Sequence, residues 1–484
     1  MKLKINWNLK NTYASLPESL FQRQEPTLVT NPKGLLWNFE LANTLGIFEN
    51  DQEPEDWELY FSGNKIAEAS IPLAQAYAGH QFGHFNRLGD GRAILLGEQI
   101  SASGDLFDLQ LKGSGPTPYS RRGDGRATLK SMLREYIMSE AMFGLGIPTT
   151  RSLAVVASGE SVIREQVQPG AVLTRVAKSH IRVGTFEYIH QFEDKEVLRT
   201  FFDYTVKRHF PECLAAEQPV LCFFEKVMEQ QIDLVVHWMR VGFIHGVMNT
   251  DNVSISGETI DYGPCAFMNR YDPNTVYSSI DRNGRYAFGQ QAPITQWNLM
   301  CLAETLLPLI HENIDIAVEM ITPLLQAFPI RYEQAWKTMM AHKIGLQQNE
   351  ASHELILELL KWMNAHKADY TNTFIKLMHS KEINEMIYEE KAFLSWRKKW
   401  ETAVAQQEGG FERAYTLMQR SNPCYIPRNS LVEKALDNFQ NLNDRTQFDV
   451  LLDVLKHPYQ LQEGATFLMQ ATEDESTYQT FCGT

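Results

Sequence analysis

The sequence lacks three features that would place it in a specialised class of protein. It has no run of roughly 18 apolar residues, the length that a helix needs to cross a membrane, and its first eight residues lack the apolar core of a signal peptide. It also has no excess of positive charge, since its formal net charge is −14 over 484 residues. Nucleic acids are bound by clustered Lys and Arg. We therefore expect a cytoplasmic protein with no nucleic-acid partner and no membrane association.

The cysteines form no pattern that indicates a metal site. No C-x-x-C pair and no zinc-type spacing occurs among them, so reduced thiols in a reducing compartment are expected. The remaining composition, 44% hydrophobic and 21% charged, is typical of a globular protein with a large core. The six cysteines are Cys213, Cys222, Cys265, Cys301, Cys424 and Cys482.

The first part of the chain is predicted to be rich in β-strands. Residues 1 to about 70 alternate short apolar pieces with Pro, Asn and Asp, which indicates an irregular arm. The apolar run 93–96, the turn 103–105 and the alternating stretch 106–112 then predict a hairpin. Further on, apolar spacing predicts a helix over 127–145 and strands over 153–157 and 172–176.

The second part is predicted to be mostly helical, with helices over 196–209, 225–241, 296–310 and 314–327. A β-rich part followed by a helical part favours an α+β protein with two lobes and a cleft between them. We expect an N-terminal extension over 1–75, a β-rich lobe over 76–190, a helical lobe over 191–345, and a C-terminal helical extension over 346–484.

Two histidines, His80 and His84, have the i, i+4 spacing of a metal-binding pair on a helix. Gly79 and Gly83 disfavour a helix there, and no third ligand stands nearby in the sequence. Packing or hydrogen bonding is the simpler interpretation.

Most of the candidate chemistry lies between His245 and Pro264. Kinase-type phosphoryl transfer uses an H-R-D-x-x-x-x-N loop followed by D-F-G, which supply a base and two metal ligands. Here Asn252 and Asp261 occupy the metal-ligand positions, but Val247 replaces the base. Magnesium prefers hard oxygen ligands of this kind. A short strand over 253–255 and a turn at Gly257 are expected to bring the two ligands together.

A lysine and a helical glutamate precede this loop in kinase-like order. Lys112 ends a predicted strand and can neutralise phosphate oxygens, while a carboxylate on the next helix can hold it in place. Glu135 and Glu140 lie roughly 140° apart around that helix, so only one can face the lysine. Ordinary surface salt bridges are the alternative for either glutamate.

Other motifs are weaker by themselves. The segment Gly89-Asp-Gly-Arg92 and the triplet 124–126 are equally consistent with plain turns. Arg175 and Arg182 flank a basic segment that can match phosphate with bidentate forks, but a solvated face explains them as well.

Taken together, the motifs closely resemble the selenoprotein O family, also called the YdiU or UPF0061 family, over nearly the whole chain. The stretches that carry the resemblance are G-H-Q-F-G (79–83), L-G-D-G-R-A (88–93), L-K-G-S-G-P-T-P-Y-S-R (111–121), G-D-G-R-A (123–127), G-I-P-T-T-R (146–151), H-G-V-M-N-T-D-N (245–252), D-Y-G-P (261–264) and N-P-x-x-x-x-R-N (422–429).

The resemblance implies a protein-kinase-like fold and a protein nucleotidyltransferase that moves AMP from ATP, or UMP from UTP, to Ser, Thr or Tyr hydroxyls of proteins, with Mg²⁺ or Mn²⁺. It implies that the nucleotide is reversed relative to kinases, so that the α-phosphate is attacked. Asp251 would accept the proton, Asn252 and Asp261 would hold the metal, and Lys112 would pair with Glu135. Nucleotide contacts would come from Gly89, Gly91, Arg92, Lys112, Asp124, Gly125, Arg175, Arg182 and Asp261.

Attack at the α-phosphorus is chemically consistent with the absence of a base at Val247. Reaction at the α-phosphorus needs no base at the Val247 position, and such transfers depend mainly on positioning and charge neutralisation. Two alternatives stay open: a phosphotransferase with the same fold, and a nucleotide-binding scaffold without activity.

The family also often carries a redox-active C-terminal Cys, selenocysteine in animals, which some bacterial members pair with a Cys in the loop after D-Y-G. Cys482 occupies the C-terminal place, but residues 274–279 contain no Cys. We therefore expect no regulatory disulfide to that loop, although Cys265 lies nearby in sequence.

Overall fold

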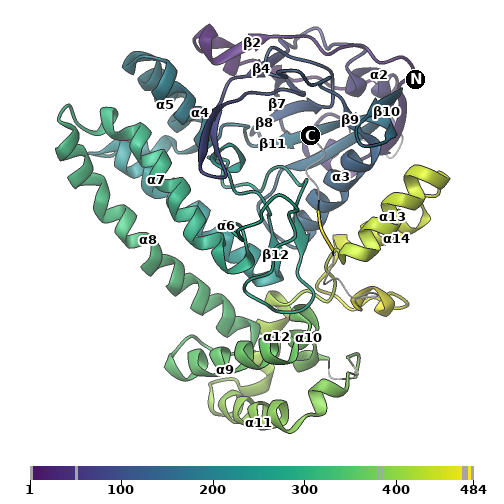
Figure 1. The fold of residues 1–484 in the computed structure, drawn as a ribbon, viewed down its shortest axis with the longest axis vertical. Helices are drawn as coiled ribbons and strands as arrows, with labels where there is room; N and C mark the ends of the chain where they lie inside the picture. The colour runs from purple at the N-terminus through teal and green to yellow at the C-terminus, as the bar shows by residue number, and fades with distance from the viewer. Residues whose placement is uncertain (1–3, 49–52, 380, 384, 471–477, 481–484) are drawn as a thin grey trace.

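The computed structural model describes residues 4–48, 53–379, 381–383, 385–470 and 478–480. They form a mixed α/β protein in which a β-sheet occupies one end and a long helical part extends from it (Figure 1). The fold class α+β is thereby confirmed at this coarse level.

The main sheet has nine strands, and every pairing within it is antiparallel. Its path is β2–β4–β7–β8–β11–β10–β3, with β1 added beside β7 and β9 beside β11. The strands are β1 (Leu9–Lys10), β2 (Phe21–Arg23), β3 (Lys33–Trp37), β4 (Leu73–Gln75), β7 (Ala93–Ile100), β8 (Leu106–Lys112), β9 (Ala127–Thr128), β10 (Arg151–Ile163) and β11 (Val167–Ala177).

The predicted hairpin of β7 and β8 is confirmed, with Ala93 opposite Lys112 at its open end. The irregular arm expected before residue 70 is wrong, because β1, β2 and β3 from this segment all join the sheet. The short helices α1 (Phe39–Thr44) and α2 (Trp57–Ser62) also lie there. These elements are too short to show a periodic pattern, and pairing with longer strands stabilises them.

The predicted helix over 127–145 is α3 (Leu129–Gly144), and it packs on β10 and β11. Thr128 caps its first turn by accepting a hydrogen bond from the backbone N–H of Ser131. Its apolar side chains are buried, except that of Phe143, which is exposed. The C-terminal helices α13 (Asn429–Leu442) and α14 (Thr446–Lys456) return to cover α3 from the other side (Figure 1).

The helical part is built on α6 (Pro219–Val241), α7 (Gln291–Ile310) and α8 (Ile314–Lys343), which pack against one another. As predicted, α6 ends at Gly242, whose φ of 74° suits a residue without a side chain. Helix α8 continues past the expected end at 327 and contains Pro323 and Pro329. Packing against α6 and α7 overrides this local break.

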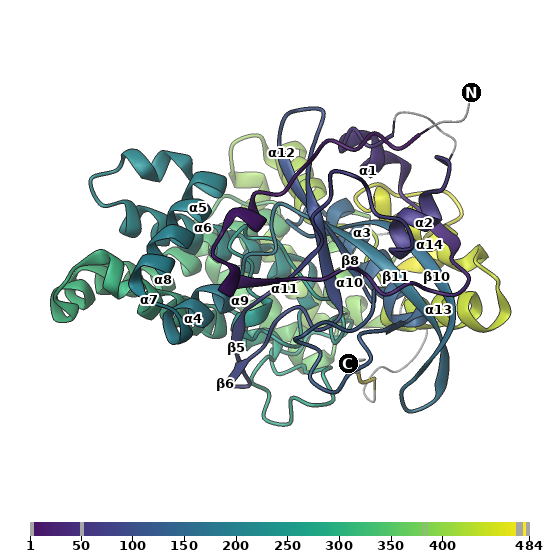
Figure 2. The ribbon, with the colours of Figure 1, turned by 90° about the horizontal axis from the view of Figure 1, so that it is seen from above.

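The remaining helices complete the molecule. Figure 1 shows α9 to α12 gathered at the end remote from the sheet, and Figure 2 shows the small β5–β6 hairpin beside α4. These elements are α4 (Val183–Phe192), α5 (Lys195–His209), α9 (Glu350–His366), α10 (Tyr370–Met378), α11 (Lys391–Gln406), α12 (Gly410–Ser421), β5 (Ala78–Gln81), β6 (His84–Arg87), β12 (Phe243–Ile244) and β13 (Ala266–Phe267).

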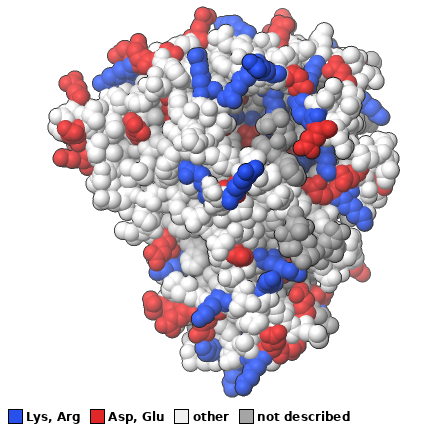
Figure 3. Space-filling view, viewed as in Figure 1, with Lys and Arg blue, Asp and Glu red and all other residues white. Residues whose placement is uncertain are grey.

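The surface mixes charges of both signs. Figure 3 shows Lys and Arg interspersed with Asp and Glu over the visible face, without a single basic stripe. Among the described residues, no helix combines the length and apolar character required to cross a membrane.

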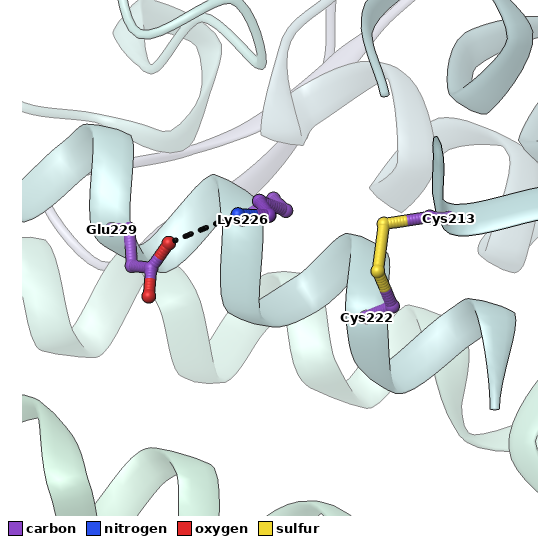
Figure 4. The surroundings of a disulfide bond; sticks show 4 residues. All are labelled: Cys213, Cys222, Lys226 and Glu229. Atoms are coloured by element: carbon purple, nitrogen blue, oxygen red, sulfur yellow. Dashed lines mark ion pairs between the residues drawn. A yellow bond between two sulfur atoms is a disulfide. The ribbon is translucent and has the colours of Figure 1, made fainter. Parts of the chain in front are cut away.

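The expectation that all cysteines are reduced is wrong for two of them. Cys213 and Cys222 form a disulfide with a Cα–Cα distance of 5.5 Å (Figure 4). Cys213 lies in the 3-10 turn Pro211–Ala215 and Cys222 in the first turn of α6, so the chain reversal between them sets the geometry. The sequence separation of nine residues matches no common cysteine motif. Cys482 lies outside the described residues.

Candidate nucleotide and metal site

The loop from His245 to Pro264 is closed at its base by a two-stranded sheet. Strands β12 and β13 pair antiparallel on either side of the loop. The His245 ring nitrogen Nε2 lies 2.9 Å from the carbonyl oxygen of Ile260. Gly246 has a φ of 83°, and a Cβ there would come within 2.5 Å of the Pro264 carbonyl oxygen. The His-Gly pair is therefore required for this close crossing of the chain.

The strand expected over 253–255 is wrong, because only Ser254 forms a bridge, and its partner is Arg182. The loop instead attaches to the segment before α4. The backbone N–H of Val183 donates to the Val253 carbonyl at 2.9 Å, and that of Ile255 donates to Ile181, also at 2.9 Å. The predicted turn at Gly257 is present, with a φ of 72°.

A cluster of four charged residues lies where the sheet meets this loop, with Lys112, Glu135 and Arg175 buried and the Asp261 side chain 25% exposed. Lys112 Nζ is 2.5 Å from Glu135 Oε2 and 2.5 Å from Asp261 Oδ1. Arg175 Nη1 donates to the same Asp261 oxygen at 2.8 Å. Glu140 points elsewhere and binds Arg151 at 2.7 Å. The structure thus separates the two helical glutamates that sequence spacing left as alternatives.

Asp261 is an ionised carboxylate in this cluster. Burial alone would raise its pKa, but Lys112, Arg175 and Arg182 outweigh that effect and hold the pKa well below its usual value. Its backbone has a φ of 66°, which is uncommon for a residue other than glycine. Lys112 and Arg175 both donate to Oδ1. Among the described residues, no hydrogen bond to Oδ2 is present.

Asp251, ten positions earlier in the same loop, has the opposite environment. It is buried, and its Oδ1 atom has no hydrogen-bond partner in the part of the chain that the structure describes. Burial raises its pKa to about 6, although Arg182 acts in the opposite direction. An ionisable group of this kind is typical of a catalytic position.

Arg182 connects the two carboxylates with the sheet. Its guanidinium lies over the Tyr77 ring, 4.2 Å from the centroid, and 3.9 Å from Asp90 Oδ1. It acts electrostatically on both Asp251 and Asp261. The guanidinium atom Nε is buried without a partner among the described residues. A fixed cation facing both aspartates can neutralise an anionic ligand between them.

The glycine-rich motif of Gly89 and Gly91 forms a tight loop at the start of β7. The Gly91 N–H donates to the Gly89 carbonyl at 2.7 Å. A Cβ on Gly89 would lie 2.3 Å from the Tyr119 ring. The carbonyl of the next residue, Arg92, accepts from Gly113 at 2.7 Å, which joins this loop to the end of β8 beside Lys112.

Asp124 and Gly125 are held in a different way. Both Asp124 oxygens bind Arg164 at 2.9 Å, and no hydrogen bond or ion pair among the described residues links Asp124 to the Lys112–Asp261 cluster. Gly125 has a φ of 66° and packs on Gly115, where a Cβ would come within 2.1 Å of the backbone. The structure therefore shows a rigid turn at this position.

The residues around G-H-Q-F-G have a role that the sequence did not indicate. His80 and His84 lie on paired strands β5 and β6, so the helical metal pair considered for them is wrong. The His80 N–H donates to Thr250 Oγ1 at 2.7 Å, and this hydroxyl donates to Glu187 Oε2 at 2.5 Å. A Cβ on Gly79 would lie 2.3 Å from Asp251 Oδ1.

The hairpin therefore packs directly on the catalytic candidate. Its first strand requires a glycine because Asp251 occupies the space of a side chain, and the next residue anchors Thr250. The motif Gly-His-Gln-Phe-Gly was the sequence signal for this role. Its contact with Thr250 spans 170 positions of the chain, so local spacing could not reveal it.

The chemistry of the donor set is that of a hard divalent cation site. Asn252 carries an amide oxygen and Asp261 a carboxylate, the donor types such a cation prefers, and the unpartnered Asp251 Oδ1 lies in the same loop. The Asn252 amide is oriented because its Nδ2 donates to the Val247 carbonyl at 3.0 Å. Val247 is buried and cannot take a proton.

The geometry places fixed cations and two carboxylates of opposite electrostatic character beside one loop. Comparison with known proteins identifies the family. The family model described as "Protein adenylyltransferase SelO" matches residues 3–456. The chain is 52% identical over 484 residues to the protein nucleotidyltransferase YdiU of Alkaliphilus metalliredigens, covering 100% of this chain and 99% of that protein.

A second protein of the same name, from Alcanivorax borkumensis, is 50% identical over 488 residues and is covered completely in both chains. A third, from Syntrophotalea carbinolica, is 50% identical over 480 residues, covering 99% of this chain and 98% of that protein. The chain belongs to the SelO family of protein adenylyltransferases.

Proposed function

We propose that the protein transfers AMP from ATP to Ser, Thr or Tyr hydroxyls of other proteins and releases pyrophosphate. The observation that carries this proposal is the opposed state of two aspartates in one loop. Asp261 is held ionised by two cations, whereas Asp251 has a pKa raised to about 6 and a free oxygen. The ionised Asp261 is suited to hold a metal cation that neutralises phosphate charge, and Asp251 is suited to proton transfer.

In this proposal the triphosphate lies against Lys112, Arg175 and Arg182. Their buried positions give them a low-dielectric setting in which they act strongly on phosphate oxygens. The loop of Gly89, Gly91 and Arg92 lines the other side. Asp124 and Gly125 would contact the nucleotide through the edge of the rigid turn that they form.

Asn252 and Asp261 would hold Mg²⁺ or Mn²⁺, which when bound supplies positive charge to the phosphates. Asp251 accepts the proton of the attacking hydroxyl. The hydroxyl oxygen then bonds to the α-phosphorus, the bond from that phosphorus to its bridging oxygen breaks, and pyrophosphate leaves with the electron pair. No base is needed at the position of Val247, because Asp251 takes the proton.

We further propose that the core is a kinase-like pair of lobes over 76–190 and 191–345, with extensions over 1–75 and 346–484. The order of Gly loop, strand lysine, helix glutamate and metal loop supports this reading. The ion pair of Lys112 with Glu135 supports it too, because it joins β8 to α3 beside the loop.

Two labelled substrates test the reaction. Incubation with protein acceptors and either α-³²P-ATP or γ-³²P-ATP should give label on protein from the α position only. Label from the γ position alone would instead show a phosphotransferase, and no label with any nucleotide or metal would show an inactive scaffold. Parallel α-³²P-UTP and intact-mass analysis of the enzyme report which nucleotide is transferred, since AMP and UMP differ in mass.

A further inference from the structure

A second group of metal-type donors lies outside the proposed catalytic site. His80 of β5, Glu187 of α4 and Cys301 of α7 each offer one ligand atom, and these atoms all lie within 4.8 Å of one another. The three residues come from elements far apart in the chain: His80 and Glu187 are 107 positions apart, and Glu187 and Cys301 are 114 positions apart. Only the fold brings them together.

Glu187 is the centre of this group. It is buried, and its Oε1 lies 2.5 Å from His80 Nδ1 while its Oε2 accepts from Thr250. The Cys301 sulfur lies within 4.8 Å of its carboxylate. Within the described part of the chain, Glu187 forms no ion pair with any Lys or Arg. Its basic neighbour is His80, which is only partly buried. A buried carboxylate is unfavourable unless positive charge balances it, and a metal cation at this position can do so.

The surroundings add negative charge. Glu304, one turn after Cys301 on α7, is exposed at the rim and acts electrostatically on both Glu187 and Cys301. Burial, with these two carboxylates, raises the pKa of the Cys301 thiol to about 12. Arg285 acts in the opposite direction on the Cys301 thiol, and its guanidinium lies over the Trp297 ring, 4.7 Å from the centroid.

We propose that His80, Glu187 and Cys301 bind a divalent transition metal of the zinc class, with water as a fourth ligand. Imidazole nitrogen, carboxylate oxygen and thiolate sulfur are the donors that zinc prefers. His80 and Cys301 are only partly buried, so an ion and a water molecule can reach them. The hard-oxygen set of Asn252 and Asp261 selects a different class of cation.

Binding exchanges protons for the metal. The thiol releases one proton, and the metal replaces the proton shared by His80 and Glu187, so a neutral imidazole and two anions balance the 2+ charge. Metal–ligand bonds of about 2.0–2.3 Å require the His80 and Glu187 atoms, now 2.5 Å apart, to separate by about 1 Å. Glu187 Oε2 keeps its hydrogen bond from Thr250.

The position of the site gives it a consequence. The metal would tie β5 to α4 and α7 through residues that also hold Thr250, next to Asp251. It would therefore fix the strand whose Gly79 packs on the Asp251 carboxylate.

Cobalt titration of the full-length, metal-stripped protein tests the site, without reductant so that the Cys213–Cys222 disulfide stays closed. Co²⁺ bound by a thiolate gives a near-ultraviolet charge-transfer band and strong tetrahedral visible bands. We expect one equivalent to bind with this signature and Zn²⁺ to displace it.

Cys301→Ser should remove the charge-transfer band. It should also weaken cobalt binding by more than about 100-fold, because loss of a residue that only orients a metal ligand already costs about 10- to 100-fold in affinity. Cys424→Ser, which removes a different free thiol that is buried, is the matched control and should keep the band. Asp261→Asn should keep it as well, because the hard-cation site is separate. His80→Asn leaves the thiolate in place and should weaken binding, and the circular dichroism of each variant checks folding.

The proposal is overturned if the wild-type protein gives no thiolate–cobalt band. It is also overturned if folded Cys301→Ser keeps the band, or if Asp261→Asn removes it. None of these readouts depends on nucleotide transfer, so failure of the metal site and failure of the proposed function are distinguishable.

Discussion

Asp261 and Asp251 lie ten residues apart in one loop, both next to Arg182, yet the protein treats their charges in opposite ways. Two further cations contact Asp261 Oδ1, whereas no donor contacts Asp251 Oδ1 in the described structure. Burial acts in the same direction on both, so the neighbouring charges decide the outcome. The difference teaches that a buried carboxylate is assigned its chemistry by its partners rather than by its depth.

The largest expected effect follows from neutralising Asp261. Asp261→Asn should lower the rate of nucleotide transfer by about 10³-fold or more. The metal loses a ligand, and with it the positive charge that stabilises the phosphates is lost. It should also lower the free energy of unfolding by about 3 kcal/mol, since Lys112 and Arg175 keep only Glu135 as a close anion. Transfer assays and urea denaturation measure the two effects. Unchanged stability would contradict the described ion-pair cluster.

Asp251→Asn should have the second-largest effect on activity. Unlike Asp261→Asn, it should raise the free energy of unfolding. Loss of the proton acceptor should reduce kcat by about 10²- to 10⁴-fold. A rise of the pKa from 3.8 to about 6 corresponds to a cost of up to about 3 kcal/mol for keeping the folded protein ionised. The variant should therefore unfold at higher urea concentration than wild type at pH 8.

The sign of that stability effect depends on pH. The folded-state pKa is raised, so stability falls as pH rises from about 4 to about 6 and the cost is fully present above pH 6. The gain from Asp251→Asn should be largest at pH 8 and vanish near pH 4. A gain that is equal at both pH values would show that another group sets it.

The same carboxyl predicts the acidic limb of the rate profile. Because Asp251 must be ionised to accept a proton, kcat/KM should fall below about pH 6, one power of ten per pH unit, in the free enzyme. The measurement is the initial rate at low nucleotide concentration from pH 4.5 to 8.5. A limb near pH 4 would show that the site does not raise the pKa of Asp251.

Parts of this site could be predicted from sequence because they depend on local pattern. The β7–β8 hairpin, the helix that carries Glu135, and the turn at Gly257 all follow from spacing and turn residues. Spacing also showed that Glu135 and Glu140 cannot both reach Lys112, but which one does so depends on how α3 lies on the sheet. That choice required the three-dimensional packing.

Other parts had no local signal. The hydrogen bonds from His80 to Thr250 and from Thr250 to Glu187 join segments far apart in sequence. The pairing of Cys213 with Cys222 depends on the chain reversal before α6. The first strands of the sheet are two to five residues long, so only their partners define them.

A smaller effect is expected from the glycine that contacts Asp251. Gly79→Ala places a Cβ 2.3 Å from Asp251 Oδ1, so the carboxylate must move, and a displacement of about 1 Å can cost about 10²-fold in rate. KM for nucleotide should change less than kcat, because Lys112 and Arg175 are not displaced. Gly104→Ala is the control for a strained substitution away from the site: its Cβ meets open space, but its φ of 91° should cost some stability, while kcat should stay unchanged.

The smallest effect on activity is expected far from both aspartates, at the disulfide. Replacing Cys213 and Cys222 together with Ser should lower the free energy of unfolding by about 2–3 kcal/mol, the loop-closure value for so short a loop. Transfer activity should not change, since neither sulfur contacts the Lys112–Asp261 cluster or Asp251. Thiol counting under denaturing, non-reducing conditions and urea denaturation measure the bond and its contribution. If reduction of the wild-type protein altered the rate while this double variant did not respond, α6 would transmit the state of the disulfide to the catalytic loop, and the two regions could no longer be treated as independent.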